Sequence, residues 1–243
     1  MIFNKRLLKA CFVALLMPVT AANAEIILHG TRAVYPSDAR EITLQMTNNG
    51  EKPSLVQAWI DEGDPKTTPD KSKAPFVITP PITRVEAGEG QSLRISQLPT
   101  AQSLSKNRET LFWLNVLEIP PKPAKNDKAA PENYLQLAIR SRIKFFYRPD
   151  SIKTDSSAAP KQLRWTTKGN QLTVNNPTPF YITLTSVVQK QNNSDKTLAL
   201  SDGMMLSPFS EQQISLNSAG VDIKDIKFTT INDYGGRVEH SVE

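Results

Sequence analysis

Two residue types that commonly bind metals and take part in catalysis are almost missing from this sequence. Its 243 residues include one cysteine, Cys11, and two histidines, His29 and His240. Zinc and copper sites depend mainly on these side chains, so we expect no metal site. A Ser-His-Asp triad would need one of the histidines, and we expect His29 within a strand and His240 in a frayed tail. The composition therefore argues against metal chemistry and against a nucleophilic enzyme.

Signals for a bound nucleotide or another cofactor are missing as well. Gly88-Glu89-Gly90 resembles part of a phosphate-binding loop, but no helical pattern follows it. A phosphate loop needs the N-terminus of a helix behind it, so this segment reads as a turn. We expect no cofactor, and nothing in the sequence argues for catalysis.

Long apolar runs are missing, and the one short run lies near the start of the chain. Lys5, Arg6 and Lys9 precede the apolar residues 11–19, and Ala22-Asn23-Ala24 has the form of a cleavage site. This pattern predicts a secretory signal peptide over residues 1–24, too short to anchor the chain in a membrane. Cleavage after Ala24 would leave 219 residues without cysteine, which must fold without a disulfide.

Removal of that segment also lowers the formal net charge. The segment carries three basic residues and no acidic ones, so the charge falls from +5 to +2. Such a small excess gives no general attraction to nucleic acid. We expect no nucleic-acid partner and no membrane insertion of the mature chain.

Short segments of alternating apolar and polar residues dominate the rest of the sequence, and none has a helical period. Segments of this kind, separated by Gly, Pro and Asn turns, are typical of all-β sandwiches or barrels. A Pro- and Ala-containing stretch at 149–160 is the best candidate for a linker. We therefore expect a domain at 25–148 and a smaller one at 161–243. The expected strands are 26–35, 42–46, 55–60, 76–79, 91–96, 110–119, 172–174, 181–188, 213–216 and 226–231.

The segment 133–148 is the longest alternating one. From Leu135 onward, apolar residues occupy most odd positions and basic residues most later even positions. This predicts a strand of unusual length, since strands usually have about 3–10 residues. It follows a loop at 120–131 rich in Pro, Lys and Ala. The apolar stripe is either an ordinary core face or an open edge that pairs with a partner strand, because open apolar edges otherwise favour aggregation.

Two basic residues inside expected strands have two possible interpretations. Arg32 lies in the first expected strand and Lys144 in the long one. They belong either to a solvated face or to a site where two cations bind an anion such as a carboxylate. Lys144 falls on the face opposite Leu135 and Leu137 unless a bulge near Ser141 changes the register. Three other charged residues are either surface charges or an ion network: Glu109, Arg148 and Asp233.

Several motifs in the same order resemble the periplasmic pilus-assembly chaperones of the immunoglobulin-like chaperone–usher class. The resemblance covers essentially the whole chain after residue 24. Its most specific part is 104–121, which includes Arg108-Glu109-Thr110 and the ending Ile119-Pro120-Pro121. The other matching segments are Gly30-Thr31-Arg32, Tyr35-Pro36, 135–149, 176–181 and Ile231-Asn232-Asp233-Tyr234-Gly235.

The resemblance implies two tandem immunoglobulin-like domains set at an angle, with a cleft between them. It implies a non-enzymatic periplasmic protein that binds pilus subunits and delivers them to an outer-membrane usher. The short loop and the absence of cysteine after residue 24 resemble the short-loop branch of the family. The implied roles are a carboxylate anchor (Arg32, Lys144), a donor strand that completes a subunit (Leu135, Leu137, Ile139) and an interdomain ion network (Glu109, Arg148, Asp233).

Two other functions compete with this one. A secreted adhesin or structural pilus subunit would have the same fold class, but it would normally carry a donor extension and a cysteine pair. A carbohydrate-active enzyme on a β-sandwich would need a pair of carboxylates in a cleft.

Overall fold

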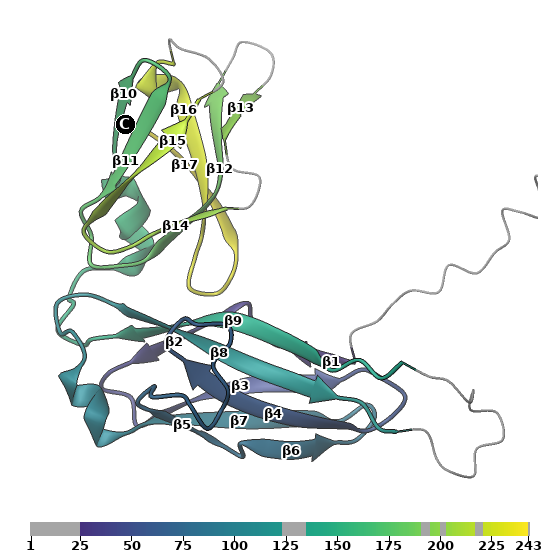
Figure 1. Cartoon of the computed structure of the whole chain (residues 1–243). Helices are drawn as coiled ribbons and strands as arrows, with labels where there is room; N and C mark the ends of the chain where they lie inside the picture. Colours follow the sequence, from purple (N-terminus) through teal and green to yellow (C-terminus); the bar gives the residue numbers. More distant parts are fainter. Residues whose placement is uncertain (1–24, 123–134, 191–194, 200–202, 217–220, 243) are drawn as a thin grey trace, which may run out of the picture.

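The computed structural model describes residues 25–122, 135–190, 195–199, 203–216 and 221–242. It confirms the expected all-β class, with two β-sandwiches in tandem that meet at an angle (Figure 1). The expected signal peptide lies outside the described residues, as does the expected loop from residue 123 onward.

The N-terminal sandwich consists of two sheets. One has the strand order β1-β3-β7-β5, and the other has the order β2-β9-β8-β4-β6. A short 3-10 helix, η1 (Pro99–Ser103), joins β7 to β8. The strands are β1 Ile26–Leu28, β2 Arg32–Pro36, β3 Glu41–Asn48, β4 Ser54–Asp61, β5 Phe76–Thr79, β6 Ile82–Val85, β7 Gly90–Gln97, β8 Thr110–Ile119 and β9 Ile139–Arg148.

The core of this sandwich lies between the two sheets and is strongly aromatic. The Phe76 ring meets the Phe112 and Phe145 rings edge to face, at centroid distances of 5.2 and 4.8 Å. The side chains of Leu93 and Leu114 are fully buried beside them. Burial of each such side chain contributes about 1.5–3 kcal/mol, so this apolar layer can hold the domain together without a disulfide.

The segment 26–35, expected as one strand, is two strands in different sheets. β1 pairs with β3, whereas β2 pairs in parallel with β9. The chain changes sheets around Gly30, whose φ of +154° is rarely adopted by residues with a side chain. Arg32 therefore begins the second strand instead of lying inside the first.

The long expected strand begins later than its alternation indicates. β9 starts at Ile139, and residues 135–138 are described but belong to no strand. The neighbouring strand β8 ends at Ile119, directly before Pro120 and Pro121, and proline has no N–H for a ladder bond. Within the described ranges, residues 135–138 therefore have no strand to pair with on that side.

The C-terminal sandwich has sheets of order β10-β11-β15 and β13-β12-β16-β17, and β14 also pairs with β12. Its core includes Leu172, Leu184 and Phe228. The sequence predicted β11, β12, β15 and β16 but not β10, β13, β14 and β17. The bounds are β10 Arg164–Lys168, β11 Gln171–Asn176, β12 Ile182–Lys190, β13 Asp195–Ala199, β14 Met204–Leu206, β15 Ser210–Ser215, β16 Ile226–Ile231, β17 Arg237–Ser241, with 3-10 helices η2 Ser156–Gln162 and η3 Ile223–Asp225.

His240 was expected in a frayed tail, and this expectation is wrong. It lies in β17, where its ring stacks on Phe228 at 5.0 Å and its Nε2 is 2.9 Å from the Thr230 hydroxyl. The terminal strand is held because β17 pairs with β16 along its whole length. His29 lies just after β1 and not within a strand, with its Nε2 2.8 Å from the Thr47 hydroxyl.

Candidate functional site

Arg32 and Lys144 are brought side by side by the parallel pairing of β2 and β9. Their Cα atoms are register partners, and both side chains lie on the face of the sheet that points to the C-terminal domain. Lys144 Nζ donates a hydrogen bond to the Thr183 hydroxyl at 3.1 Å. Arg32 Nη1 donates to the Ile231 carbonyl oxygen at 3.2 Å. Two cations from the first domain thus meet neutral acceptors from β12 and β16 of the second.

The electrostatics of this pair are unfavourable in the free protein. Burial lowers the pKa of the Lys144 ammonium, and the positive charge of Arg32 lowers it further. Burial also lowers the pKa of Arg32, although Asp233 and Glu109 oppose the change. Arg32 Nε is buried and has no hydrogen-bond partner among the described residues. The pair retains unused donors and excess positive charge, as suits a site that binds a carboxylate.

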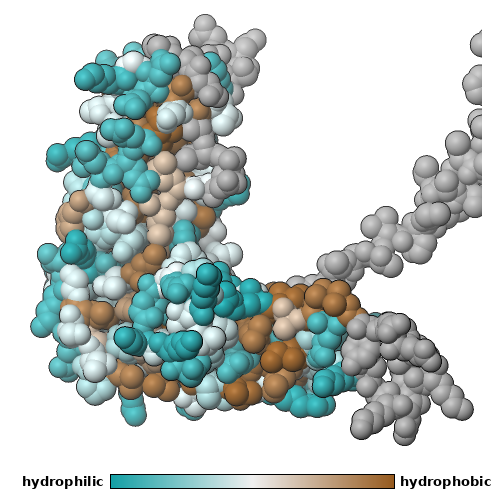
Figure 2. All heavy atoms as spheres, in the orientation of Figure 1, coloured by the Kyte–Doolittle hydropathy of each residue, from teal (hydrophilic) through white to brown (hydrophobic). Residues whose placement is uncertain are grey.

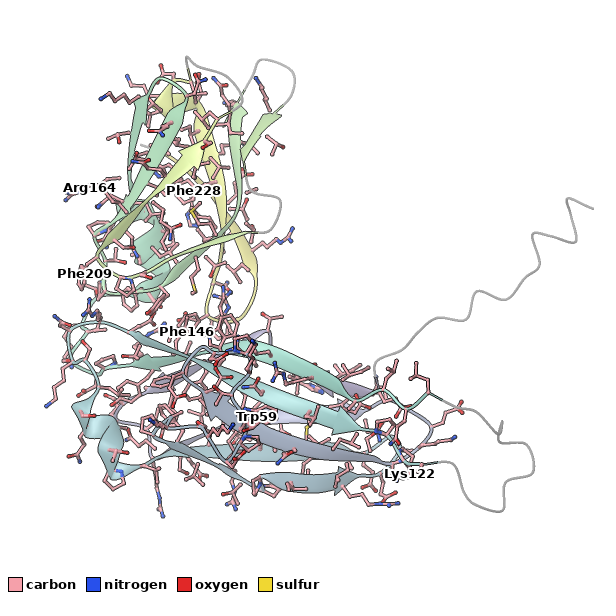
Figure 3. The ribbon with its side chains drawn as sticks, in the orientation of Figure 1. Trp59, Lys122, Phe146, Arg164, Phe209 and Phe228 are labelled. Carbon is pink, nitrogen blue, oxygen red and sulfur yellow. The ribbon has the colours of Figure 1, made fainter. Side chains whose placement is uncertain are left out.

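Phe146 lies beside the pair and supplies an apolar wall. It points from the N-terminal domain toward the C-terminal one (Figure 3), and its ring centroid is 5.6 Å from that of Tyr181. The Arg32 guanidinium carbon is 5.9 Å from the Phe146 centroid. An aromatic wall that excludes water strengthens the attraction between these cations and a bound anion.

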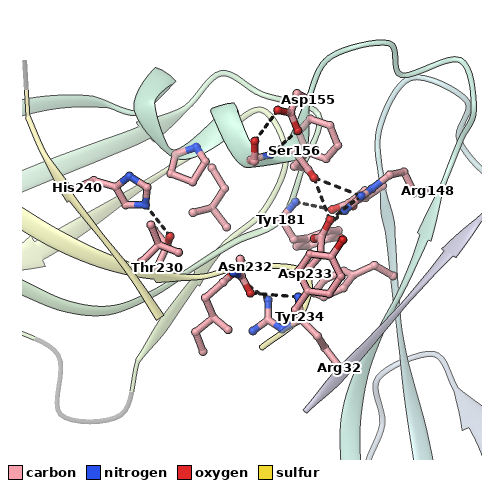
Figure 4. Close-up of a pocket in the computed structure, with 18 residues that line it drawn as sticks. Arg32, Arg148, Asp155, Ser156, Tyr181, Thr230, Asn232, Asp233, Tyr234 and His240 are labelled. Atoms are coloured by element: carbon pink, nitrogen blue, oxygen red, sulfur yellow. Dashed lines mark hydrogen bonds and ion pairs between the residues drawn. The ribbon is translucent and has the colours of Figure 1, made fainter. Parts of the chain in front are cut away.

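Arg148, at the end of β9, connects the domains through two carboxylates. Its guanidinium binds Glu109 of the N-terminal domain at 2.7 Å. It also donates to both oxygens of Asp233, in the turn between β16 and β17, at 2.8 and 2.9 Å. The Ser156 hydroxyl in η2 donates to Asp233 at 2.9 Å, as Figure 4 shows. Glu109 accepts from the Tyr181 amide at 2.8 Å, so the network closes across the domain boundary.

The two acids of this network differ in their electrostatic state. Asp233 is partly exposed, and despite the cost of burial its hydrogen bonds with Arg148 and Ser156 lower its pKa. Glu109 is almost fully buried, and burial raises its pKa despite Arg148. A buried carboxylate is therefore costly here and depends on Arg148 for its compensation.

A cavity of about 280 Å³ lies next to this network, between the C-terminal sheet and η2. Arg32, Phe146 and Tyr234 contribute to its wall, together with His240 (Figure 4). Lys144 does not line it. The cavity therefore lies on the Arg148 side of the boundary, and of the cationic pair only Arg32 lines it.

A third basic residue on the same face of β9 is paired, although the sequence did not single it out. Arg142 Nη2 lies 2.6 Å from Asp61, whose side chain is fully buried and also accepts from Asn115 at 2.7 Å. The Arg142 guanidinium stacks over Trp113 at 4.3 Å. The sequence did offer a signal for this ion pair, since Asp61 is an acid directly after the apolar run 55–60. Among the described residues, Lys144 forms no ion pair, whereas Arg142 and Arg148 both do.

The apolar stripe at the start of β9 is exposed. The exposed fractions are 81% for Leu135, 62% for Leu137 and 49% for Ile139. β2 pairs with β9 only from Lys144 to Arg148, so within the described residues the β9 edge from Ile139 to Ile143 has no partner strand. Figure 2 shows apolar surface gathered at this end of the N-terminal domain.

The register of β9 answers the question that its alternation left open. Pairing between β8 and β9 runs without a shift from Tyr147 to Ile139, so no bulge interrupts the strand near Ser141. Ile139 and Phe145 therefore share one face and Lys144 lies on the other. The exposed stripe and the cationic pair use opposite faces of the same strand.

The described residues contain neither a candidate metal cluster nor a candidate membrane-spanning helix. Within the described ranges, no cluster of three or more His, Cys, Asp or Glu side chains could hold a metal ion. No helix in that part of the chain has the length and apolarity to cross a membrane.

Comparisons with known proteins cover both domains. Residues 25–153 match the family described as pili and flagellar-assembly chaperone, PapD N-terminal domain, and residues 158–242 match pili assembly chaperone PapD, C-terminal domain. The chain is 44% identical to the chaperone protein MrkB of Klebsiella pneumoniae over 94% of this chain and 95% of that protein. It is 38% identical to the probable fimbrial chaperone YadV of Escherichia coli K12 over 98% of each.

Solved structures agree with these matches. The crystal structure of the YadV chaperone aligns with a TM-score of 0.71 and 36% identity, over 89% of this chain and 98% of that one. A chain from the structure of the Salmonella enterica SafA pilin in complex with the SafB chaperone aligns with a TM-score of 0.71 and 28% identity. That alignment covers 92% of this chain and 99% of the other.

Proposed function

Because this chain belongs to the pilus-assembly chaperone family, we propose that it binds pilus subunits in the periplasm and delivers them to an outer-membrane usher. It acts without catalysis, by supplying structure that a subunit lacks. The observation that carries the proposal is the β9 edge from Ile139 to Ile143, which has no partner strand among the described residues. Three exposed aliphatic side chains lie at and before its start, and an uncompensated pair of cations lies just beyond its other end. SafB, a chaperone structure of similar fold, was solved with a pilin bound.

The proposed anchor is the pair Arg32 and Lys144, which receives the terminal carboxylate of the subunit. A carboxylate would accept from Arg32 Nε, which is buried and has no partner among the described residues, and from the remaining N–H groups of Lys144. It would also compensate the repulsion from Arg32, which adds to the effect of burial in lowering the pKa of Lys144. Loss of one cation from such a buried contact costs about 2–5 kcal/mol, because the anion is left without its partner.

The proposed donor strand begins at Leu135 and continues through Leu137 and Ile139 into β9. A subunit that lacks one strand exposes core side chains and unpaired backbone. Backbone pairing along β9 would satisfy the backbone groups, while the alternate aliphatic side chains fill the subunit groove. Three such side chains contribute about 5–9 kcal/mol at ~1.5–3 kcal/mol each, before the cost of ordering residues 135–138 is subtracted.

The proposed role of the Arg148 network is to set the angle between the two domains. Arg148 and Glu109 come from the N-terminal domain and Asp233 from the C-terminal one. The anchor also needs both domains, because Thr183 and Ile231 lie opposite the two cations. A change in the interdomain angle would therefore alter the space available for the subunit terminus.

Co-expression with a cognate subunit tests the proposal. We expect Arg32→Ala and Lys144→Ala each to reduce the amount of subunit protected from proteolysis by at least tenfold, since one buried charge contact is lost. Arg94→Ala and Lys52→Ala are matched controls, because both side chains are exposed and away from the cleft. If Arg32→Ala and Lys144→Ala protected the subunit as well as these controls, the anchor would be wrong.

The donor strand is tested separately with Leu137→Glu. A charge placed in an apolar groove should abolish subunit binding, whereas Leu98→Glu, at another exposed leucine, should not. The measurement is co-purification of the subunit with the tagged chaperone. Undiminished binding by Leu137→Glu would rule out this role for the stripe.

A further inference from the structure

A buried carboxylate lies at the end of the N-terminal sandwich where β8 leaves the sheet. The Glu118 side chain is on the core-facing side of β8, and the residue is only 6% exposed. Its cross-strand neighbours are Val56 on β4 and Ile139 on β9. A charged group in such a place is expensive unless hydrogen bonds and an opposite charge compensate it.

The hydrogen bonds are present, and they come from neutral donors. Glu118 Oε2 accepts from the Ile26 amide at 3.2 Å, and Oε1 accepts from the Ser54 hydroxyl at 3.1 Å. The same hydroxyl lies 3.1 Å from Oε2 of Glu25. Glu118 forms no ion pair with any described residue. Two carboxylates thus converge on one buried serine, Ser54, at the start of β4.

Glu25 is also the residue that follows the predicted signal-peptidase bond. We propose that cleavage after Ala24 creates the cation that this cluster requires, namely the α-ammonium group of Glu25, and that it pairs with Glu118. Hydrolysis consumes one water: the Ala24 carbonyl carbon takes the hydroxyl, and the released Glu25 amine takes protons to become an ammonium. With an ordinary pKa of about 7.7–8.0, that group is mostly charged at neutral pH.

The position of Glu25 suits this pairing. Its nitrogen is one residue before the Ile26 amide that already contacts Glu118, so it lies within about 3.8 Å of the Ile26 nitrogen. The Glu25 carbonyl accepts from the Asn49 amide at 2.6 Å. Its side chain packs on Gly50, where an added Cβ would come within 2.7 Å of the Glu25 Cγ. The Glu25 backbone is therefore fixed at its carbonyl, and the next amide along the chain already contacts the buried acid.

This inference rests on the proposed export, and it links maturation to subunit binding. Glu118 is the cross-strand partner of Ile139, where β9 begins and the proposed donor stripe ends. The ion pair between the Glu25 ammonium and Glu118 would stabilise the end of the sheet from which residues 135–138 extend. The precursor would lack this ion pair. The subunit-binding edge would therefore reach its full stability only after the signal peptide has been removed.

A double-mutant cycle tests the pairing. The mature protein beginning at Glu25 is compared with the same protein carrying Ala24 in front, each released from a cleavable fusion with a defined N-terminus. We expect the extra residue to lower the folded-to-unfolded ratio in urea about tenfold, because it moves the ammonium away. In the Glu118→Gln background the extra residue should change the ratio less than twofold. An equal loss in both backgrounds would overturn the proposal.

Titration of the α-amino group gives a second measurement that a merely structural role would not affect. The charged groups that face it are the carboxylates of Glu118 and Glu25 itself. We expect its pKa to be raised in the mature protein and to fall toward the ordinary value in Glu118→Gln, with a smaller fall in Glu25→Gln. An unshifted pKa in the mature protein would also overturn the pairing. Mass spectrometry of the exported chain tests the cleavage site separately, and neither result depends on subunit binding.

Discussion

The two groups of cations between the domains, Arg32 with Lys144 and Arg148 with its acids, differ in what compensates their charge. Arg148 has two carboxylates, and its ion pair with Asp233 crosses from one domain to the other. Arg32 and Lys144 contact a carbonyl and a hydroxyl, and they repel each other. Both groups are partly buried and lie on the same face of the β2–β9 pair.

The difference in partners leads to different expected roles: Arg148 should support the folded structure, and Arg32 with Lys144 should bind an anion. A buried cation that already has a carboxylate partner gains little from a second anion, whereas one that has only neutral acceptors gains a great deal. The first group should therefore stabilise the free protein, and the second should destabilise it until a subunit arrives. Substitutions in the two groups should have opposite effects on the free energy of unfolding.

Loss of Arg148 should have the largest effect. Arg148→Met leaves Glu109 buried without a cation, and we expect unfolding to become about 3–5 kcal/mol easier. Chemical denaturation of the free protein measures this. The control is Arg84→Met, which breaks a fully exposed pair with Glu86 and should change the free energy of unfolding very little. Equal losses in the two variants would mean that the network is only a surface feature.

A change at Gly235 should have the next largest effect, and it affects the domain contact without touching a charge. An added Cβ would collide with the Thr31 hydroxyl of the other domain, and φ is +84°. We expect Gly235→Ala to cost about 2 kcal/mol or more. Gly169→Ala, with φ +60° and open space around it, should cost about 1 kcal/mol from backbone strain alone.

A second substitution checks the origin of that difference. Thr31→Ala removes the hydroxyl with which the Cβ would collide, so Thr31→Ala combined with Gly235→Ala should cost no more than Gly169→Ala. Small-angle X-ray scattering would report whether the interdomain angle changes in Gly235→Ala and returns in the double variant. A persistent excess cost would place the origin of the effect elsewhere.

Loss of Lys144 should have a smaller effect of the opposite sign. Lys144→Met removes a charge that burial and Arg32 disfavour. Because solvent screens this half-buried charge, we expect the free protein to become more stable by less than about 1 kcal/mol, net of the lost hydrogen bond to Thr183. The same variant should fail to protect subunits. The measurement is denaturation in the absence of any subunit. A clear loss of stability would show that Lys144 supports the fold.

The smallest predicted effect is the pH dependence of the stability gained in Lys144→Met. Because the pKa of Lys144 is lowered in the folded state, the unfolded chain binds more protons between the folded-state pKa and the ordinary value of about 10.4. The destabilisation of the folded protein by charged Lys144 is complete at pH values below this window, and it disappears as the pH rises through the window. We expect the stability gap between wild type and Lys144→Met to narrow toward pH 10, as measured by urea midpoints. A constant gap would exclude titration of Lys144 as its cause.

Alternation in the sequence predicted many of the strands, because each strand buries one face. The bounds of β5 and β8 were predicted correctly from apolar segments with turns or prolines on either side. The change of sheets at Gly30 was not, because alternation specifies a face and not a partner strand. β13 and β17 were also missed, since they have few apolar residues to mark them and are held by their neighbours.

Without the family resemblance, the residue pattern predicted the candidate site only as residue types in expected strands. The sequence could not tell whether Arg32 and Lys144 are solvated or converge, because their meeting depends on the parallel register of β2 and β9. It also did not single out Glu118, although an acid at a core-facing position of a strand was the available signal. Long-range pairing decides such questions, and local patterns do not contain it.

The short overlap between β2 and β9 has a geometric consequence for any strand that binds there. An incoming strand would lie in line with β2, and its last residue would meet Arg32 at the point where β2 begins. Because it ends at Arg32, the incoming strand must run parallel to β9, from the Ile139 end toward Lys144. Lys144 is five residues from Ile139, about 16 Å along a strand at ~3.3 Å per residue. The position of the anchored terminus would therefore set the register of the bound strand. It would determine which subunit residues lie beside Ile139, Leu137 and Leu135.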